Sequence, residues 1–236
     1  MLDAASIADA AVDVADAEGV DAVSMRRVGA RLGVSGMALY RHVTDRDDLL
    51  RRMVGRIAVE VPPVVEADAD WRSTLARLAE STWTAFERHR WLVDVAISPA
   101  RLVDGAPAAG TETVLRRLID AGLTPERAHD LLLAVAAVPI GIARITLTAR
   151  HVDYADAAAP GPLTAAFRAT SFDAARGRRL LALALEALLD SVAASLRVVG
   201  QAGVAAGLGT AAPPTAVEDR PAASLPVAAE AAHHRK

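Results

Sequence analysis

Apolar residues recur at helical spacing from the start of the chain and predict an opening helix. Ile7, Ala11, Val14 and Ala15 would share one face of such a helix. Gly19 follows them, and glycine is the residue best able to adopt the left-handed turn that ends a helix. The first predicted helix therefore ends close to residue 19.

Two more short helices are predicted directly after it. Ser24 is a good N-cap for the second helix, which Gly33 ends, and Ser35 caps a third helix over residues 36–42. The turn between them is too short for antiparallel packing, so the two helices must cross steeply, as in a helix-turn-helix. We expect three residues to fill the wedge between them, namely Ala30, Val34 and Leu39.

A fourth predicted helix begins at Thr44 and ends before Pro62 and Pro63. Thr44 and Asp47 have the spacing of a capping box, and a proline pair is incompatible with a continuing helix. The apolar face of this helix consists of Leu49, Leu50, Met53, Val54 and Ile57. The proline pair predicts a domain boundary after residue 61.

Beyond residue 62 the pattern predicts further helices and neither a strand nor a repeat. The predicted helices span residues 71–89, 91–97, 111–121 and 125–150, followed by a short helix around Phe167 and a last one over 173–199. The last helix has a wide apolar stripe, which predicts two packing partners. From Gly200 onward the composition reduces to Ala, Gly and Pro with scattered charges, which predicts a disordered tail over residues 200–236. The fold class predicted is all-α.

The formal net charge of −3 conceals a basic patch near the N-terminus. Between residues 24 and 56 the bases are Arg26, Arg27, Arg31, Arg41, Arg46, Arg51, Arg52 and Arg56, against Asp45, Asp47 and Asp48. Met37 and Tyr40 are predicted to be exposed beside these arginines. Such a surface is either an ordinary helical corner or a face that enters a DNA groove. We interpret Arg51, Arg52 and Arg56 as a solvated face rather than as phosphate contacts.

Several classes of protein are disfavoured by the sequence. The chain has no cysteine, and its first 21 residues contain acids but no base, so we expect no disulfide framework and no secretory leader. The longest apolar run, residues 131–143, is shorter than the roughly 20 residues that cross a bilayer. No catalytic, cofactor or metal motif stands out, and His233 and His234 are interpreted as solvated. We expect a cytoplasmic protein that is not an enzyme, with no membrane partner.

Residues 23–50 resemble the DNA-binding domain of the TetR family of repressors. The family pattern is a Leu-Gly-Val-Ser turn, a Leu-Tyr-x-His-Phe segment, a base and a pair of leucines. This chain matches it with Leu32-Gly33-Val34-Ser35, Leu39-Tyr40-Arg41-His42, Arg46 and Leu49-Leu50. Val43 stands where the family usually has Phe, and Arg46 stands where it usually has Lys.

The resemblance implies a DNA-binding surface on the second and third helices. It implies that Tyr40 and His42 contact phosphates, that Arg46 does so in place of the family's lysine, and that Met37 and Ala38 approach base edges. The full candidate set for DNA binding is Arg26, Ser35, Gly36, Met37, Ala38, Tyr40, Arg41, His42 and Arg46.

Arg26 is the strongest candidate for reading a base directly, because Arg can bond bidentately to O6 and N7 of guanine. The usual adenine readers are missing nearby, since the chain has no Asn and its single Gln is Gln201. Part of the specificity is therefore expected to come from DNA shape. Gly36 is expected to add flexibility beside this surface, at a cost of up to about 1 kcal/mol.

The residues after the proline pair are expected to hold a small-molecule inducer. The candidates are Trp83, Phe86, Trp91 and Arg144, although core packing explains the aromatic residues equally well. Pro139 and Gly141 are expected to kink the helix over residues 125–150 or to allow a close approach within it.

The resemblance also implies a domain organisation and a function. Residues 1–61 would form the helix-turn-helix DNA-binding domain, including the connector helix, and residues 62–199 a helical ligand-binding and dimerisation domain. The expected function is a repressor that binds a near-palindromic operator in double-stranded DNA as a homodimer and is released by a small molecule. Two alternatives stay open: an activator of the same fold, and a ligand-binding helical dimer without an operator. The last helix could also be a core helix within one subunit.

Overall fold

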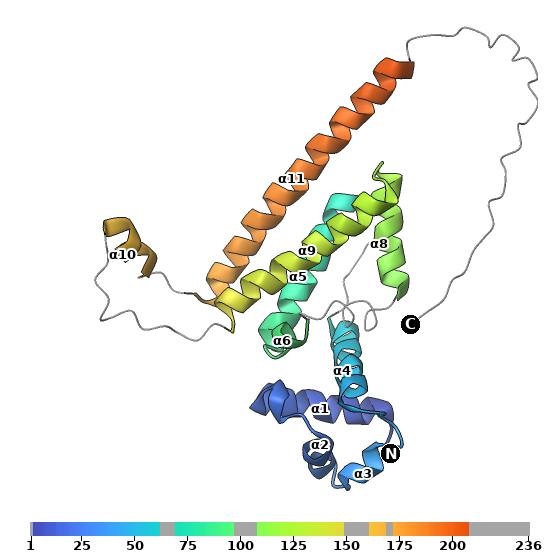
Figure 1. The fold of residues 1–236 in the computed structure, drawn as a ribbon, viewed down its shortest axis with the longest axis vertical. Helices are drawn as coiled ribbons and strands as arrows, with labels where there is room; N and C mark the ends of the chain where they lie inside the picture. The colour runs from blue at the N-terminus through green and yellow to red at the C-terminus, as the bar shows by residue number, and fades with distance from the viewer. Residues whose placement is uncertain (1, 62–68, 97–107, 149–160, 169–171, 208–236) are drawn as a thin grey trace, which may run out of the picture. The chain divides into compact units, whose positions relative to one another are not determined.

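The computed structural model of this protein describes residues 2–61, 69–96, 108–148, 161–168 and 172–207. Its regular structure in these residues consists of helices and contains no strand, as the sequence predicted (Figure 1). The N-terminal helices are α1 (Ala4–Glu18), the short 3₁₀ helix η1 (Val20–Ala22), α2 (Met25–Arg31), α3 (Gly36–Leu39) and α4 (Arg46–Glu60). The C-terminal helices are α5 (Trp71–Arg88), α6 (Leu92–Ala96), α8 (Ala108–Asp120), α9 (Pro125–Thr146), α10 (Pro162–Arg168) and α11 (Ala174–Gly207).

Chain contacts divide the molecule into one unit over Met1–Val198 and a second over Val199–Lys236. The first unit holds all helices up to α10 and most of α11. The boundary predicted after residue 61 is therefore not a break between compact units.

Most predicted helix starts are confirmed by their caps. The side chains of Ser24 and Asp70 accept hydrogen bonds from the backbone of α2 and α5, and Thr124 does the same for α9. The prediction for α4 was one residue early. Its N-cap is Asp45, whose carboxylate accepts from the Asp48 N–H at 2.8 Å, whereas Thr44 donates its own N–H to the Asp48 side chain. Thr44 is therefore outside the helix that it was expected to cap.

The N-terminal helices share one apolar core, in which α1 packs against α4 and α2 packs against α3. The wedge between α2 and α3 is filled differently from the prediction. Leu39 is fully buried, but Ala30 is exposed and Val34 only half buried. Gly29 takes the close position instead, because a Cβ atom there would lie 2.9 Å from the Val34 carbonyl oxygen. The turn needs a glycine at this point, and the apolar pattern did not reveal it.

The C-terminal helices pack around α5, which contacts α6, α8 and α9. Two ion pairs join α5 to α11 in antiparallel orientation, one between Arg178 and Glu87 and one between Arg72 and Asp190. The apolar stripe of α11 faces this core, with Leu181, Leu185 and Leu189 buried. Gly177 marks the closest approach, since a Cβ atom there would overlap the indole ring of Trp83.

Two of the predicted features of α9 and α11 need correction. Helix α11 continues to Gly207, so residues 200–207 are helical rather than part of a disordered tail, and residues 208–236 lie outside the described residues. Helix α9 runs through Pro139, and Gly141 has no atom within 4 Å of where a Cβ would lie, so no close approach occurs there within the described chain.

Helix α9 is also longer than its apolar core run suggested. By length and composition alone it would suffice to cross a membrane, because alanines and isoleucines extend the run on both sides. One face of the helix nevertheless packs on α5 and α8 and buries Ala128, Leu131, Val135 and Ala143. Core helices of helical proteins share this composition.

Candidate nucleic-acid interface

The turn between α2 and α3 is built on backbone contacts that only glycine permits. Gly33 has a φ of +70°, in the left-handed region that favours glycine. A Cβ atom on Gly36 would lie 3.1 Å from the backbone carbonyl oxygen of Met25, so the start of α3 rests directly on the first turn of α2. Gly36 therefore fixes the position of α3, and the expected flexibility is not its role.

A surface formed by α2 and α3 faces solvent. We call the following residues the α2–α3 face: Arg26, Ser35, Met37, Ala38, Tyr40, Arg41 and His42. The side chains of Met37 and Tyr40 are 76% and 51% exposed, although both are large and mainly apolar. Ser35 occupies the N-cap position of α3, yet its hydroxyl accepts no hydrogen bond from the helix. The hydroxyl therefore stays available to an external partner.

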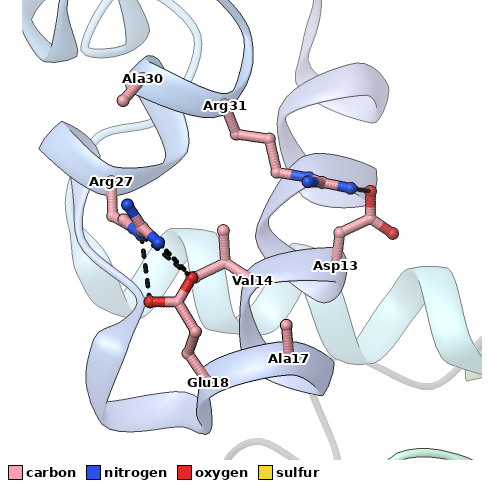
Figure 2. A pocket seen from close by; sticks show the side chains of 7 residues that line it. All are labelled: Asp13, Val14, Ala17, Glu18, Arg27, Ala30 and Arg31. Carbon is pink, nitrogen blue, oxygen red and sulfur yellow. Dashed lines mark hydrogen bonds and ion pairs between the residues drawn. The ribbon is translucent and has the colours of Figure 1, made fainter.

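Arginines in this region divide into two groups by their partners. Arg27 pairs with Glu18 and Arg31 pairs with Asp13, each at 2.6 Å, and Figure 2 shows both pairs spanning a hollow between α2 and α1. The Glu18 carboxylate raises the pKa of Arg27. Among the described residues, Arg26 and Arg41 form no hydrogen bond or ion pair. The positive charge that remains unneutralised thus lies on the α2–α3 face.

Arg46 is attached to the protein rather than free. Its Nη2 donates to the Val20 carbonyl oxygen at 3.0 Å and its Nε donates to the Val23 carbonyl oxygen at 3.3 Å. These bonds tie the start of α4 to the segment between α1 and α2. Arg46 still carries its charge at the surface, so its contact with phosphate stays a prediction.

The basic residues farther along α4 also have partners. Arg52 pairs with Asp48 at 3.0 Å, and Arg56 pairs with Asp9 on α1 at 2.5 Å. Burial raises the pKa of Asp48, but the hydrogen bond from the Thr44 backbone and the Arg52 charge outweigh it and leave the pKa lowered. The Asp48 carboxylate is consequently ionised and holds the start of α4 in place.

The predicted ligand residues do not gather at one described cavity. Trp83 and Phe86 lie fully buried on α5, and the Trp83 Nε1 has no hydrogen-bond partner among the described residues. Trp91 donates its Nε1 to Asp16 on α1 at 2.7 Å, and Arg144 pairs with Asp94 on α6. Only Trp83 and Phe86 therefore keep the character of an interior lining.

Sequence reasoning missed the polar cluster around Asp16. His89 lies 7% exposed at the end of α5 and faces two carboxylates, those of Asp16 and Glu60. The three residues are far apart in the chain, so no local pattern connects them.

Comparison with known proteins identifies two matching family models. Residues 7–53 match the model described as bacterial regulatory proteins, tetR family, and residues 63–143 match the tetracyclin repressor-like C-terminal domain. The two matched segments meet the two halves of the helical arrangement described above, α1–α4 and the helices that follow.

Two curated relatives illustrate the similarity. The HTH-type transcriptional repressor DrrR1 of Streptomyces coeruleorubidus is 36% identical over 143 residues, which cover 60% of this chain and 52% of the relative. The tetracycline repressor protein class A from transposon 1721 of Escherichia coli is 33% identical over 135 residues, covering 56% of this chain and 61% of the relative. The chain thus spans about half the length of the first curated relatives it matches.

Solved structures agree over a larger share of the chain. A possible TetR family transcriptional regulator from Streptomyces coelicolor A3(2) has a TM-score of 0.63 at 29% identity and covers 82% of this chain and 100% of its own. The Streptomyces coelicolor protein ActR in complex with (S)-DNPA has a TM-score of 0.54 at 27% identity, with 80% and 98% covered. TetR from Acinetobacter baumannii AYE, at 23% identity, supports the fold alone, with a TM-score of 0.63 and coverages of 83% and 99%.

Proposed function

Because the chain belongs to the TetR family of DNA-binding transcriptional regulators, we propose that it is a cytoplasmic repressor that binds a near-palindromic operator as a homodimer and is released by a small molecule. The observation that carries this proposal is the α2–α3 face. There, exposed Met37 and Tyr40 lie beside arginines that no carboxylate neutralises. A surface of this composition is suited to the grooves and phosphates of DNA.

Individual roles on this face follow from the chemistry of each side chain. Arg26, at the start of α2, is assigned to guanine O6 and N7, while Met37 and Ala38 offer apolar contact to thymine methyl groups. Tyr40, His42, Arg41 and Ser35 are assigned to phosphate oxygens, with Arg46 as a further cation behind them. Gly36 serves by allowing α3 to approach α2.

Homodimer formation is supported by apolar residues that the described chain leaves uncovered. Leu133 and Ile145 on α9 are 58% and 51% exposed, and Leu183 on α11 is 65% exposed. Both helices already bury their opposite faces in the core of their own chain. We assign their outer faces to a four-helix interface with a second copy, which places two α2–α3 faces on half-sites roughly 34–36 Å apart.

Ligand sensing is assigned to the C-terminal helices. The printed descriptions of two neighbours name small molecules bound to them, minocycline and (S)-DNPA. In this chain the buried Trp83 and Phe86 are the proposed lining, and the unpartnered Trp83 Nε1 is a donor that a ligand acceptor would satisfy. Trp91 and Arg144 are assigned to the rim. Release of DNA requires that the ligand bind the DNA-incompetent state more tightly, with α4 as the connecting element.

The decisive experiment measures binding to fragments of the promoter DNA adjoining the gene, across a salt series, together with the mass of the protein in solution. We expect saturable binding of a dimer to one near-palindromic fragment. The logarithm of affinity should fall with the logarithm of salt by about 0.9 per phosphate contact. Weak, sequence-indifferent binding would favour the ligand-binding dimer without an operator. Transcription from the bound promoter in vitro distinguishes a repressor, which lowers it, from an activator of the same fold.

A further inference from the structure

The end of α5 is tied to the N-terminal helices by a group of four side chains, which we call the latch: Asp16, Glu60, His89 and Trp91. Asp16 lies on α1 and Glu60 is the last residue of α4, whereas His89 and Trp91 lie between α5 and α6. His89 and Trp91 are almost completely buried, at 7% and 5% exposure. The latch therefore connects the helices proposed to bind DNA with the helices proposed to sense a ligand.

Asp16 is the centre of the latch. Its Oδ1 accepts a hydrogen bond from the Trp91 Nε1 at 2.7 Å, and its carboxylate faces the His89 Nδ1 at 2.9 Å and 3.0 Å. An ionised carboxylate can only accept hydrogen bonds, so the Nδ1 of His89 must carry a proton. Two donors from one short segment of chain thus converge on one charge, and hydrogen bonds to a charge are roughly twice as strong as neutral ones.

The other ring nitrogen of His89 has no such partner. Its Nε2 is buried and makes no hydrogen bond among the described residues, and the Glu60 Oε1 lies 3.6 Å from it. In neutral His89 this nitrogen would be an acceptor with no donor, an unfavourable state for a buried polar atom. A second proton converts it into a donor that faces a carboxylate. Glu60 is otherwise paired only loosely, with Arg88 at 3.3 Å.

We propose that the latch is sensitive to protons: protonation of His89 bridges Asp16 on α1 and Glu60 on α4, and so fixes the orientation of the N-terminal helices on the C-terminal helices. The charged groups that face His89 are Asp16 from α1 and Glu60 from α4, with Arg88 beside Glu60. A buried imidazolium requires such compensation, and here two carboxylates supply it. This inference rests on the proposed function for its meaning in regulation, but its geometry does not.

The test measures the distance between the two groups of helices within one chain. Because the chain has no cysteine, spin labels can be attached specifically through the exposed positions Ala5→Cys on α1 and Glu80→Cys on α5. Dilution with excess unlabelled protein leaves only the intrachain distance, which pulsed electron paramagnetic resonance reports. The measurement needs neither DNA nor an inducer, so it succeeds or fails independently of the repressor proposal.

In the unmodified latch we expect the distance distribution to narrow as the pH falls from about 8 to about 5.5, the range in which histidine changes charge. Asp16→Ala should give a broad distribution at every pH. The matched control is Asp13→Ala, which removes a carboxylate from the same helix whose partner Arg31 lies on α2. It should leave the distribution as it was, and a distribution equally narrow in Asp16→Ala would overturn the proposal.

Two conservative variants separate proton binding from packing. His89→Asn keeps a donor near the Nδ1 position but cannot take up a proton, and Glu60→Gln removes the second carboxylate. Both should fold, keep the distribution found at high pH and lose its narrowing at low pH. Narrowing that persists in both variants would show that another group senses the proton, and the latch would be rejected.

Discussion

Two regions of this protein expose large apolar side chains, and they do so in different company. On the α2–α3 face, Met37 and Tyr40 lie beside Arg26 and Arg41, which have no carboxylate partner among the described residues. On α9 and α11 the exposed residues are Leu and Ile, on helices whose other face is a buried core. Exposure is alike in the two regions, whereas the neighbouring charges differ.

The difference shows what each region is suited to contact. A mixed surface with free cations fits a polyanion whose bases present methyl groups and acceptors. A surface of aliphatic residues fits a second surface of the same kind, as in subunit interfaces with apolar cores. The chemistry of the neighbours, more than exposure itself, therefore distinguishes the two proposed interfaces, and four predictions test the distinction.

The largest effect is expected from a charge on the aliphatic surface. Leu183→Glu should convert the dimer into a monomer, because a buried unpaired charge costs about 3–5 kcal/mol, or on the order of 10²–10³ in the dimer dissociation constant. Helicity of the separated chain should be unchanged, since Leu183 is exposed within it. Analytical ultracentrifugation measures the mass. Leu163→Glu, on exposed α10, is the control and should remain dimeric; a dimeric Leu183→Glu would place the interface elsewhere.

The next effect concerns the free cations of the α2–α3 face. Arg26→Ala should weaken operator binding by about 1–3 kcal/mol, roughly 5–150-fold, and relax discrimination at one base pair. Fluorescence anisotropy with operators changed at single positions measures both. Arg27→Ala is the matched control from the same helix, because Arg27 is already paired with Glu18. Equal losses of discrimination in the two variants would remove Arg26 from its assigned role.

A smaller effect is expected from the turn that supports this face. Gly29→Ala should lower the free energy of unfolding by about 1–3 kcal/mol, since the new methyl group would lie 2.9 Å from the Val34 carbonyl oxygen. Thermal unfolding followed by circular dichroism provides the measurement. Ala30→Ser, at the exposed neighbouring position, should change stability by no more than about 0.5 kcal/mol. Similar losses in both variants would mean that α2 itself, and not the turn, is sensitive.

The smallest effect compares the two regions through their helix caps at acid pH. The pKa of Asp70 is lowered by the hydrogen bond from the Ser73 backbone, and that of Asp48 is also lowered. Each carboxylate thus stabilises the fold above its unfolded pKa of about 3.8–3.9, and this contribution disappears as the pH falls through the lower folded value.

Replacing either carboxylate should therefore make unfolding less dependent on acid. We expect Asp70→Asn and Asp48→Asn each to lower stability at pH 7, by about 0.5–2 kcal/mol for a lost cap, and to flatten the acid limb. Urea unfolding between pH 2 and pH 7 reports the change. If the N-terminal and C-terminal helices unfold together, both variants shift one transition; separate transitions would show that the two regions are independent.

The sequence alone was sufficient for the helices and for much of the α2–α3 face. Their signals are local: caps such as Ser24 and Asp70, glycine at Gly33, and apolar residues at helical spacing all act within a few positions of the chain. The exposure of Met37 and Tyr40 beside arginines followed from the same pattern and is confirmed. The DNA roles of these side chains stay predictions.

Contacts between distant segments were decided by the tertiary structure. The sequence did not indicate that Gly29 and Gly36 allow two backbones to touch, that Arg46 binds the carbonyls of Val20 and Val23, or that α11 continues to Gly207. Nor did it connect Asp16 with His89 and Trp91, more than 70 positions away. Local propensity and periodicity specify which helices form. Which charges meet and which are left free depends on how the helices pack, because hydrogen bonds and ion pairs require atoms within about 3 Å of one another.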